Sequence, residues 1–162
     1  MLAGAGFSSA VSSAGLTAFN LGGVVGAISG GMCIARWGSR ASLLPMSVMA
    51  AVAAGVMSAM SIGAGTPVTA VIVMLTITGG LINGVQTTMY AVAAHVYPPS
   101  IRSTGVGSAV AFGRIGAVLS GYVGAWALEF RGATSFFGII AVAMVVCTVA
   151  LALVTRHSPA RE

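Results

Sequence analysis

The sequence has very few charged side chains. Its 162 residues include two acidic residues, seven arginines and no lysine, so that only 6% are charged. A soluble domain carries roughly a quarter of charged residues. The chain has too few charges to cover a water-facing surface. With 57% hydrophobic residues and a mean hydropathy of +1.03, it is expected to be an integral membrane protein.

Ligands for metals and groups for catalysis are equally scarce. The two cysteines, Cys33 and Cys147, lie in apolar runs, which suits small buried side chains rather than a metal site or a disulfide framework. The expected helices contain no acidic residue, no pair of aspartates and no HExxH motif. We therefore expect no metal and no cofactor, and an intramembrane enzyme is only a remote alternative.

Five apolar runs are each long enough to cross a bilayer as a helix, which takes about 20 residues. Turns rich in glycine, proline or arginine separate them. The sequence therefore predicts an all-α integral membrane protein with five transmembrane helices, at about residues 9–35, 42–62, 68–96, 103–128 and 133–155.

The arginines are distributed unequally between the two ends of these helices. One side has five, whereas the other has only Arg131, beside Glu129. Scattered arginines without a basic run argue against a nucleic-acid partner, and they fit the positive-inside bias of membrane proteins. We expect the arginine-rich side, and with it the C-terminus, to be cytoplasmic in a cell (inner) membrane. The five arginines are Arg36, Arg40, Arg102, Arg156 and Arg161.

The five predicted helices differ in character in a repeating order. The first and fourth have small residues at every fourth position, a spacing that lines one face and allows close helix packing. The second and fifth are almost purely apolar and are expected to face lipid. The third has a polar stripe. The order suggests a three-helix unit that is repeated with its first polar member missing, as in transporters built from repeats. The rows are Gly22, Gly26, Gly30 and Gly116, Ser120, Gly124, and the stripe is Thr76, Gly80, Asn83, Thr87, Tyr90.

Arg114 lies inside the fourth apolar run. It is about eleven residues from the start of the predicted helix, or roughly 16 Å by helical rise, which is near the centre of a 30 Å hydrocarbon core. A charge at that depth is costly unless it faces a wet cavity or a partner. The planar guanidinium suits a carboxylate ligand. Snorkelling to the interface is the structural alternative.

Four other polar side chains are candidates for contact with a solute. Asn83, Thr87 and Tyr90 belong to the stripe of the third helix, and Asn20 lies in the first. Asn and Thr in membrane helices often only bond a neighbouring helix. Both interpretations remain open for these residues.

Two stretches resemble the major facilitator superfamily. The first, "GGMCIARWGSR", resembles a cytoplasmic loop motif of that family at Gly31, Arg36, Gly38 and Arg40, although Ala35 stands where the family usually has aspartate. The second, "YAVAAHVYPPSIRSTGVGSAVAFGRIGAVLSGYVGAW", is similar to the aromatic acid/proton symporter branch. The second set of matches is Tyr97, Pro98, Arg102, Thr104, Gly105, Gly107, Gly113, Arg114, Gly116 and Ala117.

This resemblance implies a partial C-terminal half of the family fold, with helices 8 to 12 present across residues 1–162. It implies proton-coupled symport of small organic anions such as aromatic carboxylates. It also implies that Arg114 lies beside the central cavity, as an electropositive group for an anionic solute or for stabilising the cavity wall. The implied partners are the lipid bilayer, a small organic anion, a proton and a missing N-terminal half. Alone, the chain is expected to be inactive. The alternative is a non-transporting membrane partner that assembles with another carrier chain.

Overall fold

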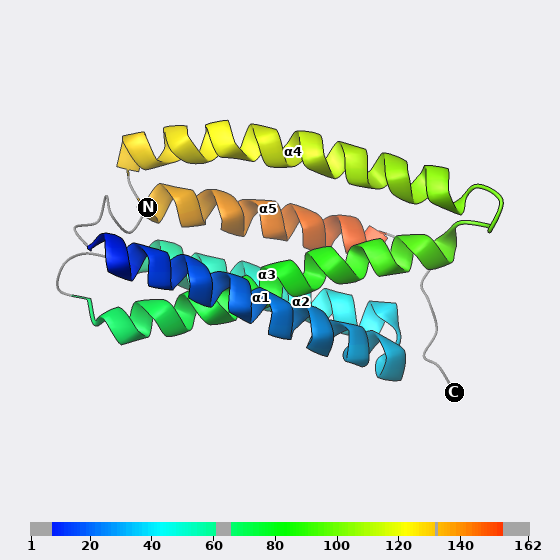
Figure 1. Ribbon diagram of the computed structural model, residues 1–162, viewed down its shortest axis with the longest axis horizontal. Helices are drawn as coiled ribbons and strands as arrows, with labels where there is room; N and C mark the ends of the chain where they lie inside the picture. Colours follow the sequence, from blue (N-terminus) through cyan, green and yellow to red (C-terminus); the bar gives the residue numbers. More distant parts are fainter. Residues whose placement is uncertain (1–7, 61–65, 132, 154–162) are drawn as a thin grey trace.

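The computed structural model describes residues 8–60, 66–131 and 133–153. Five α-helices run up and down in turn, so that each lies antiparallel to the next (Figure 1). Their bounds are α1 Ser9–Trp37, α2 Ser39–Ala59, α3 Val68–Val96, α4 Arg102–Arg131 and α5 Ala133–Leu153.

All five helices are long and apolar enough to cross a membrane, which confirms the expected all-α fold with five transmembrane helices. α2 begins three residues earlier than expected, because one residue, Gly38, makes the whole turn after α1. α4 runs on to Arg131, so Glu129, expected outside every helix, lies in its last turn. The expected ends of the second and fifth helices, at 62 and 155, fall outside the described residues.

Gly38 joins α1 to α2 in a conformation that only glycine adopts readily. Its φ is 83° and its ψ is 166°, and no other described residue has a positive φ. Its amide donates to the carbonyl of Ile34 at 2.9 Å, which closes the end of α1. The chain therefore reverses with no intervening loop.

α1 and α3 pack through glycine, as the four-residue spacing predicts. A Cβ atom added at Gly22 would collide with the backbone carbonyl of Thr76, and one at Gly26 with the carbonyl of Gly80. On α3, a Cβ at Gly84 would lie 2.8 Å from the carbonyl oxygen of Gly26 in α1. Backbone thus touches backbone over more than one turn. Such close contact stabilises helix pairs in lipid, where association depends on van der Waals packing.

α2 and α5 pack against each other and against α3, and their buried side chains form the core in two clusters. One cluster joins Met57, Val71, Leu75 and Phe137, and the other is centred on Leu43, Val85 and Met144. Both helices also have an exposed apolar face, with Val48 and Val52 on α2 and Val142 and Val146 on α5. The expectation that they face lipid therefore describes only one side of each.

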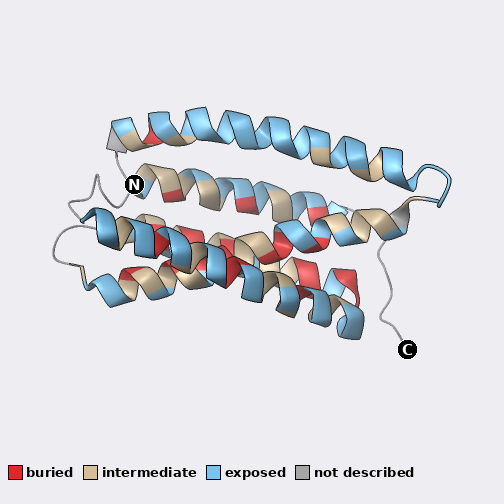
Figure 2. Cartoon of the chain, in the orientation of Figure 1, coloured by how far each residue is buried: buried red, intermediate tan, exposed pale blue. Residues whose placement is uncertain are grey.

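α4 lies at the edge of the bundle and is its most exposed helix (Figures 1 and 2). Every residue from 111 to 123 is exposed. The row of small residues on α4 has almost no partner, since a Cβ at Gly116 would meet nothing within 4 Å and only Gly124 approaches a neighbour, Phe136. The two helices with the same sequence pattern, α1 and α4, thus have different surroundings.

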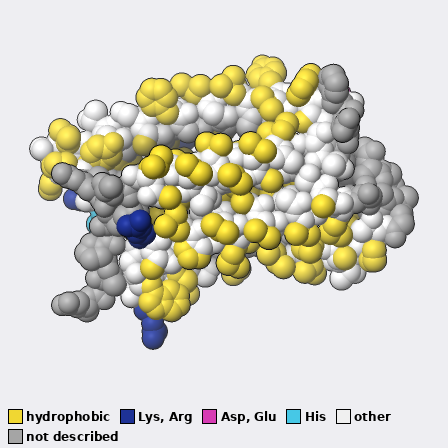
Figure 3. Space-filling view, turned by 180° about the vertical axis from the view of Figure 1, so that it is seen from behind, with side chains coloured by type: hydrophobic (Ala, Val, Ile, Leu, Met, Phe, Trp, Pro, Cys, Tyr) yellow, Lys and Arg dark blue, Asp and Glu magenta, His cyan; other side chains and the backbone are white. Residues whose placement is uncertain are grey.

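Cationic side chains gather at one end of the molecule. The α1–α2 turn and the α3–α4 loop lie at the same end (Figure 1), which places Arg36, Arg40 and Arg102 together there, while Arg131 ends α4 at the other. Seen from behind, hydrophobic side chains are spread along the surface and the visible basic side chains lie at one end (Figure 3). Arg156 and Arg161 lie outside the described residues.

Candidate functional site

Arg114 lies within the exposed stretch of α4. It is twelve residues from Arg102, where the helix begins, or about 18 Å by helical rise. Glu129 lies fifteen residues further along the same helix, about 22 Å away, and therefore cannot neutralise it. A permanent positive charge thus stands midway along an apolar helix, on a side that the described helices leave open.

Tyr90 approaches α4 beside this arginine. Its hydroxyl oxygen is 2.9 Å from the position that a Cβ atom would take at Gly113. The absence of a side chain at Gly113 allows the phenol of α3 to reach the backbone of α4. Because Arg114 follows Gly113, the hydroxyl and the guanidinium start from adjacent positions of one helix, about 100° apart around its axis.

The other polar candidates separate into two groups. Thr87 is exposed one turn before Tyr90 on α3, on the same side of that helix. Asn83 instead packs on α1, where a Cβ at Gly23 would lie 3.0 Å from its side chain, and its amide donates to the carbonyl of Gly79 at 2.9 Å. Asn20 is exposed on α1, and its amide donates to the carbonyl of Leu16 at 2.8 Å. Of these four residues, Tyr90 is the one whose side chain is seen to reach α4, and Thr87 lies on the same side of α3.

Residues of the motif between α3 and α4 contact one another across the loop. The ring of Tyr97 packs on Gly105, where a Cβ would lie 2.8 Å from the ring carbons. Arg102 donates from Nε to the carbonyl of Tyr97 at 3.4 Å. The amide of Ile101 donates to the carbonyl of Pro98 at 3.1 Å. These contacts give the motif a structural role, because they join the loop to the first turn of α4.

The residues of the α1–α2 motif have unequal surroundings. Gly38 is buried and makes the turn, whereas Arg36 and Arg40 are exposed on either side of it. Gly31 is also exposed, and a Cβ there would meet nothing within 4 Å. The positive φ of the turn explains Gly38, but nothing in the structure explains a glycine at position 31.

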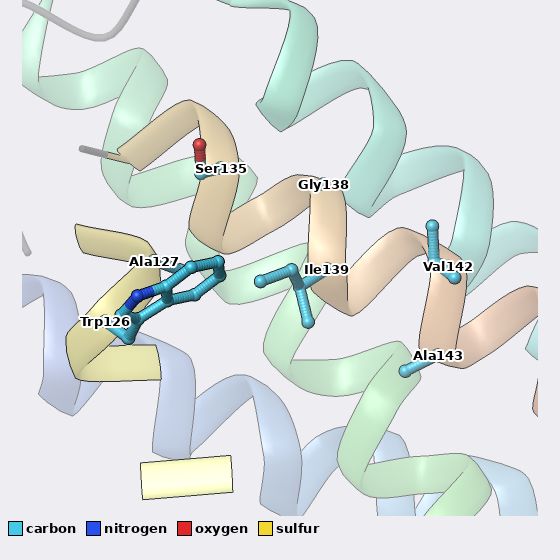
Figure 4. A pocket seen from close by; sticks show the side chains of 7 residues that line it. All are labelled: Trp126, Ala127, Ser135, Gly138, Ile139, Val142 and Ala143. Atoms are coloured by element: carbon cyan, nitrogen blue, oxygen red, sulfur yellow. The ribbon is translucent and has the colours of Figure 1, made fainter. Parts of the chain in front are cut away.

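A groove between α4 and α5 lies near the end of α4 that is remote from Arg114. It has a volume of about 520 Å³ and a mostly apolar lining that includes Ser135, with the indole of Trp126 beside Ile139 (Figure 4). The residues that line it include no ionisable side chain. Within residues 8–60, 66–131 and 133–153, no three His, Cys, Asp or Glu side chains gather as a metal site would need.

The contact between Tyr90 and Gly113 was not predicted from the sequence. Both residues were singled out, Tyr90 for its place in the polar stripe and Gly113 for its place in a motif. Neither pattern shows which helices are neighbours. A tyrosine and a glycine on sequence-adjacent antiparallel helices were the available signal.

Comparison with known proteins identifies the family. The family model of the Major Facilitator Superfamily matches residues 1–162. The chain is 35% identical over 144 residues to a gentisate transporter of Corynebacterium glutamicum, covering 86% of this chain and 30% of that protein. It is 27% identical over 127 residues to a benzoate transport protein of Acinetobacter baylyi, covering 78% and 26%.

A third relative is a 4-hydroxybenzoate transporter of Pseudomonas aeruginosa, 33% identical over 107 residues, which cover 66% of this chain and 23% of that protein. The chain thus spans less than a third of the length of these curated relatives. No solved structure matches it significantly. The match along its whole length shows that the chain belongs to the Major Facilitator Superfamily of transporters.

Proposed function

We propose that this chain forms part of the wall of a carrier that moves small aromatic carboxylates across the cell membrane together with protons. The observation that carries the proposal is Arg114, a cation midway along α4 on a side open to whatever lies next to it. A guanidinium facing lipid at that depth costs about 2.5–3.5 kcal/mol on insertion scales. A bound carboxylate in a wet cavity removes that cost, because Arg can donate to both of its oxygens.

The neighbours of Arg114 suit an aromatic acid. The hydroxyl of Tyr90 lies against α4, and Thr87 is exposed one turn before it on the same side of α3, so that both hydroxyls could bond polar substituents of a ring. The three relatives are named for gentisate, benzoate and 4-hydroxybenzoate, each an aromatic carboxylate. Their shared chemistry supports an aromatic carboxylate as the substrate here. The proton-binding groups would lie in the rest of the carrier, since the only described acidic residue, Glu129, is near a helix end.

The repeat pattern supports a partner helix over α4. The small-residue row of α1 packs on the polar face of α3, whereas the equivalent row of α4 is open. We infer that a helix like α3, from the rest of the carrier or from another chain, covers Gly116 and Ser120. The chain would then correspond to helices 8 to 12 of the family fold, with the arginine-rich end and the C-terminus in the cytoplasm of an inner membrane. A chain that only assembles with another carrier, without transporting, would use this same face.

Arg114 can be tested in a full-length carrier. The segment of the gentisate transporter that aligns with this chain is replaced by these residues, and uptake of labelled gentisate into cells is measured. Arg114→Lys keeps the charge and loses the planar fork, so we expect reduced uptake, and Arg114→Ala should reduce it further. Ile115→Ala, at the next exposed position of α4, is the matched control and should leave uptake unchanged. Normal uptake by both Arg114 variants, at equal expression, would mean that the arginine does not contact substrate.

A further inference from the structure

A second cavity lies along the N-terminal half of α1, away from the turn at Gly38, and is lined by α1, α3 and α5. Its volume is about 340 Å³, within the range of small-molecule sites. Three phenylalanines contribute to its wall, Phe19, Phe136 and Phe137, and the last two meet edge to face with ring centroids 5.6 Å apart. An apolar cavity of about 150 Å³ is enough to hold benzene, so this one has room for a substituted ring.

Two hydroxyls face this apolar space. The oxygen of Ser12 is buried and has no hydrogen-bond partner within the described structure. Thr78, which is fully buried, donates to the sulfur of Met57 at 3.5 Å, a weak acceptor. An unsatisfied buried hydroxyl costs free energy that a bound polar group recovers. The cavity therefore lacks one hydrogen-bonding group near Ser12.

The charge of the missing ligand follows from the same lining. None of the residues that line the cavity is ionisable. An ionised carboxylate would lose its hydration here without gaining a cation. We propose that this cavity binds a small neutral aromatic alcohol or phenol, whose ring lies among the phenylalanines and whose hydroxyl bonds Ser12. This site is separate from Arg114 and does not depend on the proposed transport function.

Photolabelling of the purified 162-residue chain in lipid nanodiscs tests the site. The probe is a benzyl alcohol with a diazirine on its ring, and labelled residues are mapped by mass spectrometry. We expect saturable labelling around Phe19 and Phe136 that excess benzyl alcohol removes and ionised benzoate does not. The matching diazirine-bearing benzoate should not label these residues.

Variants test the contributions of the Ser12 hydroxyl and of the cavity volume separately. Ser12→Ala should raise the half-saturating probe concentration by roughly 2- to 10-fold, which corresponds to the loss of one hydrogen bond. Ser13→Ala is the matched control, because that neighbouring hydroxyl already donates to the carbonyl of Ser9 at 3.0 Å, and it should change nothing. Ile140→Trp should fill the cavity and abolish the label.

Three results would overturn the proposal. These are unsaturable labelling spread over the exposed side chains of α4, equal affinity of Ser12→Ala and Ser13→Ala, and equal labelling by the benzoate probe. If Ile140→Trp does not fold, the comparison of the two serine variants decides alone.

Discussion

Replacing Gly26 by alanine should push the backbones of α1 and α3 apart and destabilise their packing. A Cβ at this position would overlap the carbonyl oxygen of Gly80 and lie 2.5 Å from its carbonyl carbon and 2.7 Å from its Cα. Carbon atoms in contact prefer about 3.5–4.0 Å, so the two backbones must move apart by about 1 Å. Those atoms are backbone and have no rotamer to change. The glycine contacts one turn before and after would open with them.

The size of the effect follows from two opposing terms. Overpacking of a tight site costs about 1–3 kcal/mol. Alanine in a helix is favoured over glycine by about 0.5–1 kcal/mol. The net loss of about 1–2 kcal/mol should lower the melting temperature by roughly 2–8 °C for a chain of this size. Circular dichroism of the purified chain in micelles measures it.

Gly31→Ala is the matched control for this prediction. It lies on the same helix, five residues further on, and its Cβ would meet nothing within 4 Å. This variant should melt at the parent temperature or slightly above it, since only the helix preference changes. A Gly26→Ala protein that is as stable as the Gly31→Ala protein would refute the close packing of α1 on α3.

Three further predictions concern the turn, the orientation and the open face. Gly38→Ala should destabilise the chain by about 1–3 kcal/mol, because alanine is strained at φ 83° and ψ 166°, whereas Gly55→Ala, which meets open space, should not. Thr69 and Ser100 are exposed near opposite ends of α3. With the two native cysteines removed, single cysteines at these two positions should react with impermeant reagents from opposite sides of the membrane. Reaction of both from outside would contradict the orientation. Gly116→Leu should leave the melting temperature of this chain unchanged but reduce uptake by the gentisate carrier that contains it, and unchanged uptake at equal expression would mean that no helix covers this face.

The number and position of the helices could be predicted from the sequence because apolar length alone sets them. The close packing of α1 could be predicted for a similar reason, since Gly22, Gly26 and Gly30 define a face by spacing. The same reasoning does not say whether a face is covered. Gly116 and Ser120 have the same spacing on α4, and they are open.

The candidate site shows the same limit. The depth of Arg114 follows from its distance along the helix, but the direction that it faces depends on how α4 packs. Asn83 and Thr87 belong to one stripe in the sequence, yet the first contacts α1 and the second is exposed. The buried hydroxyl of Ser12 had no sequence signal, because the cavity around it needs three helices to form.

The most direct test of the central claim is gentisate uptake by a split carrier. This chain and the complementary part of the Corynebacterium glutamicum gentisate transporter are produced in one cell from separate genes, and each is also produced alone. The account predicts uptake only when both are present, and loss of that uptake in Arg114→Ala, because this chain supplies the anion-binding wall and the other part supplies the opposing bundle. Robust uptake by the 162-residue chain alone, or none by the pair when both reach the membrane, would contradict it.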